Sequence, residues 1–403
     1  MKKKNLFSLV ALATLTLGSC TNDEVVNDYS QDNAIQFGTY MGRDVQGRGA
    51  ELTTDNLADF GVFAAYTGQT DWASSDDIDF MFNQEVSKPE NATATTKWTY
   101  SPLKYWPTTQ GDKISFFAYA PYAGKQNGAI EVKTKNNGTG IPEITYTINR
   151  DNLTEAEDFV ADVIYDRVKA DPNTNPDGTD ETVEFNLKHE LTRVSFAAKL
   201  DRNAFVDDNP SHKTIVNITK ITFGGGKFVL SADYKFSEKV EVDANERGTW
   251  TPVGNGTSEP LDIDNLLATT TPSEGDFGGY VDKGIQLKTG GLEGNEELTS
   301  LFKEDEFLFL IPANGTSGLA ADGDITITVE YDIVTVDAAL SEGYSKTSAV
   351  KEIQLPSETL AQGTAYAYTL IFYLNEIVLK ADVDEWNSGN WSTNVDWNDK
   401  DIK

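Results

Sequence analysis

Residues 35–49 read Ile-Gln-Phe-Gly-Thr-Tyr-Met-Gly-Arg-Asp-Val-Gln-Gly-Arg-Gly, and this stretch decides the fold class. Its first seven residues alternate between two faces with a period of two, which is typical of a β-strand that has one buried side. The residues on the expected buried face are Ile35, Phe37, Thr39 and Met41. The sequence therefore predicts that the folded body begins with a β-strand.

The strand ends in a loop that contains glycines and two arginines, Arg43 and Arg48. Glycine permits many backbone conformations, and exposed loops of this composition are where proteases cut. We expect cleavage after Arg48, with Arg43 as the alternative. An ordinary surface loop is the competing interpretation.

The residues before the strand have the features of a lipoprotein export signal. Lysines at positions 2–4 precede an apolar run at 6–17, which is too short for a permanent membrane-spanning helix. The run closes on Leu-Gly-Ser-Cys at 17–20, which resembles the lipobox whose cysteine carries diacylglycerol. Cys20 is the only cysteine of the chain, so no disulfide can form within it. We expect residues 1–19 to be removed and Cys20 to be lipidated; an ordinary signal peptide followed by an incidental cysteine is the alternative.

The composition is strongly acidic, which restricts the partners that the chain can bind. The formal net charge is -31, and it becomes -31 - 3 = -34 once the three signal lysines are removed. Such a surface repels nucleic acid phosphates and anionic lipid headgroups, so we expect no nucleic acid partner. Hydrophobic residues make up 39% of the chain and aromatic residues 11%, which is enough for packed cores.

The rest of the chain reads as short strands separated by Gly, Pro, Asn and Asp. Long helical periodicity is absent, and only 153–158 and 298–303 could form short helical turns. The expected strands lie at 60–66, 98–106, 114–119, 144–148, 159–165, 183–191, 194–200, 215–223, 228–236, 307–311, 325–334, 366–374 and 377–383. This pattern predicts an all-β fold of sandwich architecture.

Two features indicate how these strands are divided. Residues 169–180 are rich in Pro, Asn, Asp and Gly, so we expect an N-terminal domain at 49–175 and a C-terminal domain at 176–403, after a tether, strand and processing loop at 20–48. The apolar phase also shifts by one residue between Leu191 and Val194, which requires a bulge or kink near Thr192 and Arg193. Such a shift suits a strand that passes from one sheet of a sandwich to the other.

Several motifs, taken together with their order, resemble the fimbrillin or type V pilin family. They are the lipobox cysteine, the first strand ending near arginine, Phe-Gly-Val-Phe-Ala at 60–64, Lys-Tyr-Trp-Pro at 104–107, Phe-Phe-Ala-Tyr-Ala-Pro at 116–121, His-Glu-Leu-Thr-Arg-Val at 189–194 and Gly-Thr-Ala-Tyr-Ala-Tyr at 363–368. The resemblance implies two transthyretin-like β-sandwich domains in a surface lipoprotein of the outer membrane. It also implies that an arginine-specific protease removes the first strand and that another subunit donates a strand to the vacated groove.

Carried onto this sequence, the resemblance makes residues 35–41 the removable strand and Arg48 or Arg43 the processing site. The strand to be donated would come from the C-terminal region, either residues 377–383 or the tail beyond. Its inward-facing residues would be Ile377, Leu379, Ala381 and Val383. An ordinary last strand of the second domain is an equal interpretation of 377–383. The expected partners are other fimbrial subunits, the outer membrane through the lipid, and a host or microbial surface ligand; shaft, anchor and tip roles stay open.

No catalytic, cofactor or metal site is expected. The histidines are His189 and His212, and His189 falls on the apolar face of its strand, where a buried, hydrogen-bonded role is favoured. Asp171 begins a sequence like a calcium loop, but proline stands where glycine is needed, so an EF-hand is excluded. The competing function is a surface glycan-binding lipoprotein, because Trp386, Trp391 and Trp397 in the tail could stack on sugars.

Overall fold

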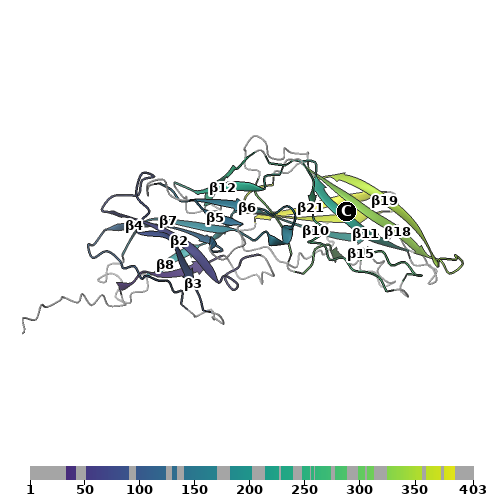
Figure 1. Ribbon diagram of the computed structural model, residues 1–403, viewed down its shortest axis with the longest axis horizontal. Helices are drawn as coiled ribbons and strands as arrows, with labels where there is room; N and C mark the ends of the chain where they lie inside the picture. Colours follow the sequence, from purple (N-terminus) through teal and green to yellow (C-terminus); the bar gives the residue numbers. More distant parts are fainter. Residues whose placement is uncertain are drawn as a thin grey trace, which may run out of the picture.

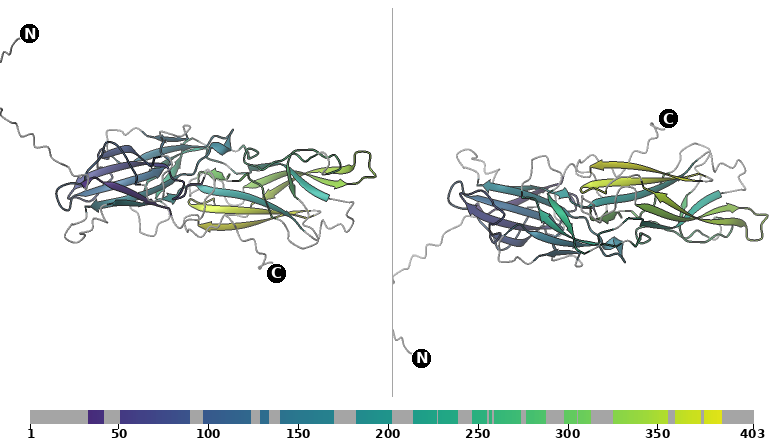
Figure 2. Two further views of the ribbon diagram at one scale, coloured as in Figure 1. Left: turned by 90° about the horizontal axis from the view of Figure 1, so that it is seen from below. Right: turned by 90° about the horizontal axis from the view of Figure 1, so that it is seen from above.

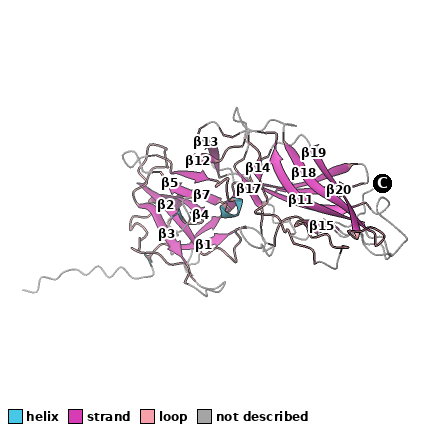
Figure 3. Ribbon diagram, turned by 45° about the vertical axis from the view of Figure 1, so that its right-hand side comes forward, coloured by secondary structure: helices cyan, strands magenta, loops and turns pink. Residues whose placement is uncertain are grey.

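The structure of the protein is a computed structural model, and it describes a defined part of the chain. The described residues are 33–41, 51–89, 97–123, 129–133, 140–169, 182–201, 214–226, 228–238, 247–254, 256–257, 259–273, 277–287, 298–304, 306–312, 325–355, 360–373 and 376–385. Within them the fold is all-β, as predicted, with a short 3₁₀ turn, η3, at Leu153–Glu155 (Figure 3). None of the helices in these residues is long and apolar enough to cross a membrane.

The molecule is elongated, with its early strands at one end and its late strands at the other (Figure 1). Sheet I has the order β3 (Met81–Ser87), β2 (Asp59–Gly68), β4 (Lys113–Ala120), β7 (Val160–Val168), β9 (Lys188–His189). Sheet II has the order β13 (Gly248–Pro252), β12 (Ser231–Phe236), β6 (Glu143–Thr147), β5 (Ile130–Val132). A two-stranded sheet joins β1 (Gln36–Tyr40) to β8 (Thr182–Asn186).

The other end of the molecule is built from two five-stranded sheets, which face each other in Figure 2. Sheet III has the order β16 (Thr299–Ser300), β10 (Thr192–Leu200), β20 (Thr364–Phe372), β21 (Ile377–Glu385), with β17 (Leu308–Leu310) also on β10. Sheet IV has the order β14 (Leu261–Asp262), β11 (Thr214–Gly224), β18 (Thr326–Val336), β19 (Tyr344–Gln354), with β15 (Ile285–Leu287) also on β11. Phe196 of β10 meets Phe223 of β11 across this sandwich, with ring centroids 6.1 Å apart.

Sheet I is buried on both faces, and this explains the continuous apolar runs of β2 and β4. Phe63 and Phe117 face sheet II, where they belong to the same core as Trp250 of β13. Phe60 and Phe116 point the other way, into a second core that includes residues of β1 and β8. The N-terminal half therefore has three layers, with sheet I in the middle.

The apolar phase shift near Thr192 marks a real crossing between sheets. β9 pairs with β7 in sheet I, whereas β10, which begins at Thr192, lies in sheet III and runs parallel to β20 over nine residues. The predicted change of sheet is therefore confirmed, but the chain passes from the first half to the second and not between the two sheets of one sandwich. It takes place at Glu190 and Leu191, which are both buried.

The strand pairing does not follow the division expected between residues 175 and 176. β8 and β9 pair with β1 and β7, and the chain returns later to add β12 and β13 to sheet II beside β6. Sheet II buries aromatic residues such as Tyr234 and Trp250 against sheet I, so its strands are held where that apolar surface lies. Strands from both sides of the expected boundary thus complete the first half.

Three other expectations differ from the structure. Residues 298–303 contain the short strand β16 instead of a helical turn, because Thr299 and Ser300 pair with β10. Residues 98–106 do not form a strand. Their β pairing consists of isolated bridges to Ser87 and Ala34. β19 was not expected, because its sequence is polar and most of its residues are exposed.

The crossing between the halves is held by buried polar groups around Glu190. Its carboxylate accepts hydrogen bonds from the backbone N–H of Arg247 at 3.0 Å and from the side-chain amide of Gln362, and its backbone carbonyl accepts one from Trp250 at 2.7 Å. Burial raises the pKa of the Glu190 carboxyl well above its usual value. Folding therefore disfavours the ionised form of the Glu190 carboxyl compared with the unfolded chain.

This raised pKa predicts a pH dependence of stability. A carboxyl whose pKa is raised by folding contributes stability below its unfolded pKa, near 4.5, and loses it as the pH rises through the folded pKa. The free energy of unfolding of Glu190→Gln minus that of the wild type should therefore increase from pH 4.5 toward pH 8, by about 1.4 kcal/mol per pH unit between the unfolded and the folded pKa. Urea denaturation across this range measures it. A difference that does not change with pH for Glu190→Gln would contradict the prediction.

Candidate functional site

The strand β1 lies in a seat formed by β8 on one side and by residues 97–106 on the other. β1 runs parallel to β8, with Gln36 to Tyr40 opposite Thr182 to Asn186. The predicted alternation is confirmed in part: Ile35, just before β1, and Phe37 are buried and Tyr40 is 51% exposed, whereas Thr39 and Met41 of the expected buried face are half-buried. That residues 35–41 contain a strand with one buried face is thus confirmed. We call the surface that β1 covers the β1 seat.

The second wall of the seat comes from the aromatic segment 97–106. The backbone N–H of Ile35 donates to the carbonyl of Lys104 at 2.9 Å, and that of Trp106 donates to Asn33 at 3.1 Å. The Tyr100 hydroxyl donates to the Ile35 carbonyl at 2.9 Å, and burial raises the pKa of this phenol, which keeps its proton in place. β1 thus has a full ladder on one side and a short bridge on the other.

The floor of the seat is aromatic and centres on Phe37. Its ring stacks on Phe185 of β8 with centroids 5.8 Å apart, and it contacts Tyr100 at 5.3 Å. Phe60 and Phe116 of sheet I meet it edge-on at 6.2 and 6.1 Å. One side chain of β1 therefore touches both walls and the central sheet.

Loss of β1 would uncover this seat. Among the strands that the structure describes, β8 has its ladder with β1 alone, so its backbone donors and acceptors along that edge would lose their partners. Exposing the side chains of Ile35 and Phe37 to water would cost a further ~3–6 kcal/mol of free energy, at roughly 1.5–3 kcal/mol for each side chain. The uncovered seat would be a strong acceptor for another extended apolar strand.

The chain directly after residues 42–50 is bound to the body of the protein independently of β1. Residues 42–50, with Arg43 and Arg48, lie outside the described residues, but Glu51 pairs with Arg193 at 2.5 Å, and both side chains are buried. The backbone N–H of Leu52 donates to the buried carboxylate of Asp158 at 2.9 Å, and His189 contacts the same oxygen at 2.8 Å. Residues 51 and 52 are thus held by the body of the protein on the far side of the loop.

The comparisons with known proteins agree with this architecture. A sequence model described as fimbrillin-like matches residues 48–386. The chain belongs to the fimbrillin-like family. It is 31% identical to the fimbrium subunit Fim1C of Phocaeicola vulgatus over 410 residues, which cover 98% of each chain. That relative is named as a subunit of a fimbrium.

Two solved structures of fimbrial proteins are similar to this fimbrillin-like protein. The crystal structure of a fimbrial protein from Bacteroides vulgatus has 25% identity and a TM-score of 0.65, and the match covers 88% of this chain and 99% of that one. The fimbrial anchor protein Mfa2 from Porphyromonas gingivalis has 11% identity and a TM-score of 0.31, with 88% and 97% covered. The first of these supports the β-sandwich fold.

The C-terminal residues of this fimbrillin-like protein that were expected to be donated form an edge strand. β21 pairs antiparallel with β20 over its whole length, from Ile377 opposite Phe372 to Glu385 opposite Thr364. Ile377 is buried, whereas Leu379 and Ala381 are only half-buried; of Val383 the structure gives the backbone pairing with Tyr366. β21 therefore occupies a partly exposed position in this chain, and its donation stays a prediction.

Some of the remaining residues singled out in the sequence lie within the described ranges, and others lie outside them. His189 is buried and paired with Asp158, as expected for a structural histidine. No group of three or more His, Cys, Asp or Glu residues that could hold a metal ion occurs in the described ranges. Cys20, His212, Asp171 and the tail tryptophans Trp386, Trp391 and Trp397 lie outside those ranges.

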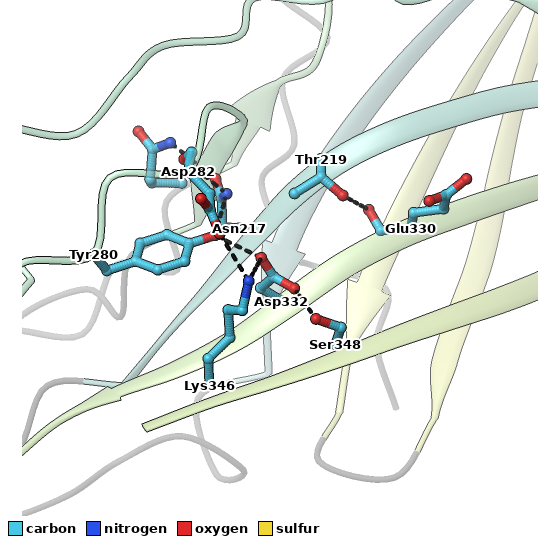
Figure 4. Close-up of polar contacts among 9 residues, drawn as sticks. Asn217, Thr219, Tyr280, Asp282, Glu330, Asp332, Lys346 and Ser348 are labelled. Atoms are coloured by element: carbon cyan, nitrogen blue, oxygen red, sulfur yellow. Dashed lines mark hydrogen bonds and ion pairs between the residues drawn. The ribbon is translucent and has the colours of Figure 1, made fainter. Parts of the chain in front are cut away.

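A second polar cluster lies on the outer face of sheet IV (Figure 4). Asn217 donates to the Tyr280 hydroxyl at 2.7 Å, and Tyr280 donates to Asp332 at 2.7 Å. Asp332 also accepts from Ser348 of β19 at 2.6 Å, and Lys346 of β19 lies beside it. These polar groups satisfy one another, so the cluster fastens the segment containing Tyr280 across the sheet, and we assign it a structural role.

The contacts of Phe37 predict its effect on stability. Phe37→Ala in the uncleaved chain should lower the free energy of unfolding by about 3–5 kcal/mol, because four ring contacts are lost and a cavity opens beneath β1. Urea denaturation measures this change. Tyr40→Ala, at an exposed position of the same strand, should change it by less than about 0.5 kcal/mol. Equal effects of the two substitutions would show that β1 does not contribute to the core.

The buried pair of Glu51 and Arg193 generates a second prediction. Glu51→Ala should lower the free energy of unfolding by about 3–5 kcal/mol, because it removes the carboxylate partner of a buried guanidinium. The matched control is Asp262→Ala, whose pair with Lys220 at 3.0 Å is exposed and should be worth less than about 1 kcal/mol. Thermal or urea unfolding distinguishes them. A loss below about 1 kcal/mol for Glu51→Ala would contradict the fastening of residue 51.

Proposed function

We propose that this protein is a structural subunit of a cell-surface fimbria that polymerises by strand exchange. In this proposal the chain is exported as a lipoprotein through Cys20 to the outer membrane. An arginine-specific protease then cuts after Arg48, or alternatively after Arg43, and releases the segment that carries β1. The C-terminal region of another subunit fills the vacated β1 seat, and the polymer supports adhesion.

The observation that carries the proposal is how β1 is bound. Its strand partner β8 and its aromatic floor all belong to segments that follow residue 50 in the chain. The ion pair of Glu51 with Arg193 and the hydrogen bond of Leu52 to Asp158 hold the chain directly after the loop. Cleavage after Arg48 would therefore release β1 and leave the new amino-terminal residues attached.

The distribution of arginines also favours cleavage in the loop. Beyond residue 48 the chain has five arginines, and the structure describes four of them. Arg193 and Arg247 are buried and ion-paired, and Arg167 lies within β7 opposite Ile114. Arg150 is bound to Glu259 beside a turn. A protease needs an extended and accessible chain, so these four positions are poor substrates.

The donor is a C-terminal strand of a second copy. β21 contains the alternating apolar residues expected of a donated strand. It is an edge strand, and its Leu379 and Ala381 are half-buried in its own sheet. In the β1 seat its inward side chains would take positions where Ile35 is 1% and Phe37 6% exposed. Exchange would thus move these side chains from a half-exposed edge to a buried site. The free energy gained by burying them drives polymerisation.

Treatment with an arginine-specific protease tests the proposal. The exported chain should lose the segment up to Arg48, start at Gly49 and form ladders of polymer on a native gel, because the uncovered seat binds a second copy. Arg48→Lys removes the preferred cut without changing the charge, and the double variant with Arg43→Lys should stay monomeric. Uncut protein, or cut protein that remains monomeric, would refute strand exchange. Unchanged monomer that binds a polysaccharide column would favour the glycan-binding alternative.

The amino terminus of the protein recovered from cells then assigns its role in the fimbria. A start at Gly49 would identify a shaft or tip subunit, since β1 has been removed. A start at Cys20 would identify an anchor subunit that keeps its lipid and its first strand. N-terminal sequencing of the surface-extracted protein separates the two.

A further inference from the structure

The centre of the β1 seat carries a carboxylate in addition to its apolar floor. Glu184 of β8 lies directly opposite Gly38 of β1. Its carboxylate folds over the glycine: a Cβ added to Gly38 would lie 2.1 Å from one carboxylate oxygen. Glu184 is exposed and makes no ion pair with any residue that the structure describes. Any strand that replaces β1 must therefore place its central outward residue against this carboxylate.

The central outward residue of β21 is a lysine. β21 and β1 have the same alternation, and Lys380 lies midway between Ile377 and Val383, just as Gly38 lies midway between Ile35 and Met41. The match therefore holds whichever way the incoming strand runs. Lys380 is exposed in its present position and makes no ion pair there with any described residue.

Resting on the proposed strand exchange, we propose that Glu184 selects the partner and sets the register of the incoming strand by pairing with Lys380 of a second copy. A shift of two residues in one direction would bring Asp382 against Glu184, where like charges repel across the strands. The opposite shift would bring Val378, which cannot pair with a carboxylate. The central register alone provides an opposite charge.

This specificity has a distinct physical source from the affinity of the seat. The apolar side chains of the incoming strand supply most of the binding free energy, but they repeat every two residues and fit shifted registers nearly as well. A charge at one position does not repeat in this way. Even a pair of modest strength therefore distinguishes registers and competing strands.

A double-mutant cycle with a peptide probe tests the proposal. The acceptor is protease-treated full-length chain, either wild type or Glu184→Lys, kept dilute to limit self-assembly. The probe is a fluorescent peptide of residues 376–385, either wild type or with Lys380→Glu. At low salt each mismatched combination should bind about two- to fivefold more weakly than the wild-type pair, as expected for an exposed ion pair. The doubly reversed pair should recover that loss, and high salt should reduce the differences.

The controls separate this proposal from the strand exchange on which it rests. Glu131→Lys, on β5 of sheet II, makes the same change of net charge at an exposed position away from the seat, and it should bind both peptides as the wild-type chain does. Equal affinities in all four combinations, or no recovery in the doubly reversed pair, would overturn the role of Glu184 while leaving strand exchange intact. Failure of the treated wild-type chain to bind any peptide would instead refute the exchange itself.

Discussion

The rest of the structure depends on the corner at residues 189–193, where the chain crosses from the first pair of sheets to the second. Each polar residue of this corner is bound to a different segment: His189 to Asp158, the carboxylate of Glu190 to the backbone of Arg247, and Arg193 to Glu51. Thr192 donates to the carbonyl of Ala361 at 2.7 Å, just ahead of β20. Buried polar groups are stable only when they are paired, so these contacts fix the positions of four distant segments at once.

The polar contacts of this corner that the structure describes do not involve β1. They join Arg193 to Glu51, Thr192 to Ala361, and Gln362 to the backbone of Gly248 in β13. β1 adds to the second core, beneath sheet I, without bridging to the second sandwich. Stability of the joint and occupancy of the β1 seat are therefore separate properties of one chain.

Periodicity in the sequence predicted the local parts of this fold well. The alternation at 35–41 correctly predicted the buried face of β1, and the phase shift near Arg193 correctly predicted the crossing between sheets. The continuous apolar runs of β2 and β4 also gave the right strands, since a strand covered on both faces needs no alternation.

Partners far apart in the chain were not predictable in this way. Glu51 and Arg193 are separated by 142 residues, and nothing in the local pattern around Glu51 distinguishes it from the many other acidic residues. The aromatic segment 97–106 was visible, but it forms a wall of the β1 seat through side chains and two backbone bonds and not through a ladder. The return of β12 and β13 to sheet II likewise depends on core shape, which one-dimensional patterns do not encode.

The edge of sheet IV bears on whether a subunit with the proposed strand exchange would have a second site for an incoming strand. β19 is eleven residues long, pairs with β18 alone among the described strands, and exposes Val350 to 66%. Such an edge could receive a foreign strand, but Lys346 and Lys351 stand along it, and charged side chains hinder pairing between edges. A second acceptor on every subunit would make branched networks. If the proposed strand exchange takes place, a hindered β19 edge would leave each subunit with one acceptor, the β1 seat, and one donor, and the product would be an unbranched filament.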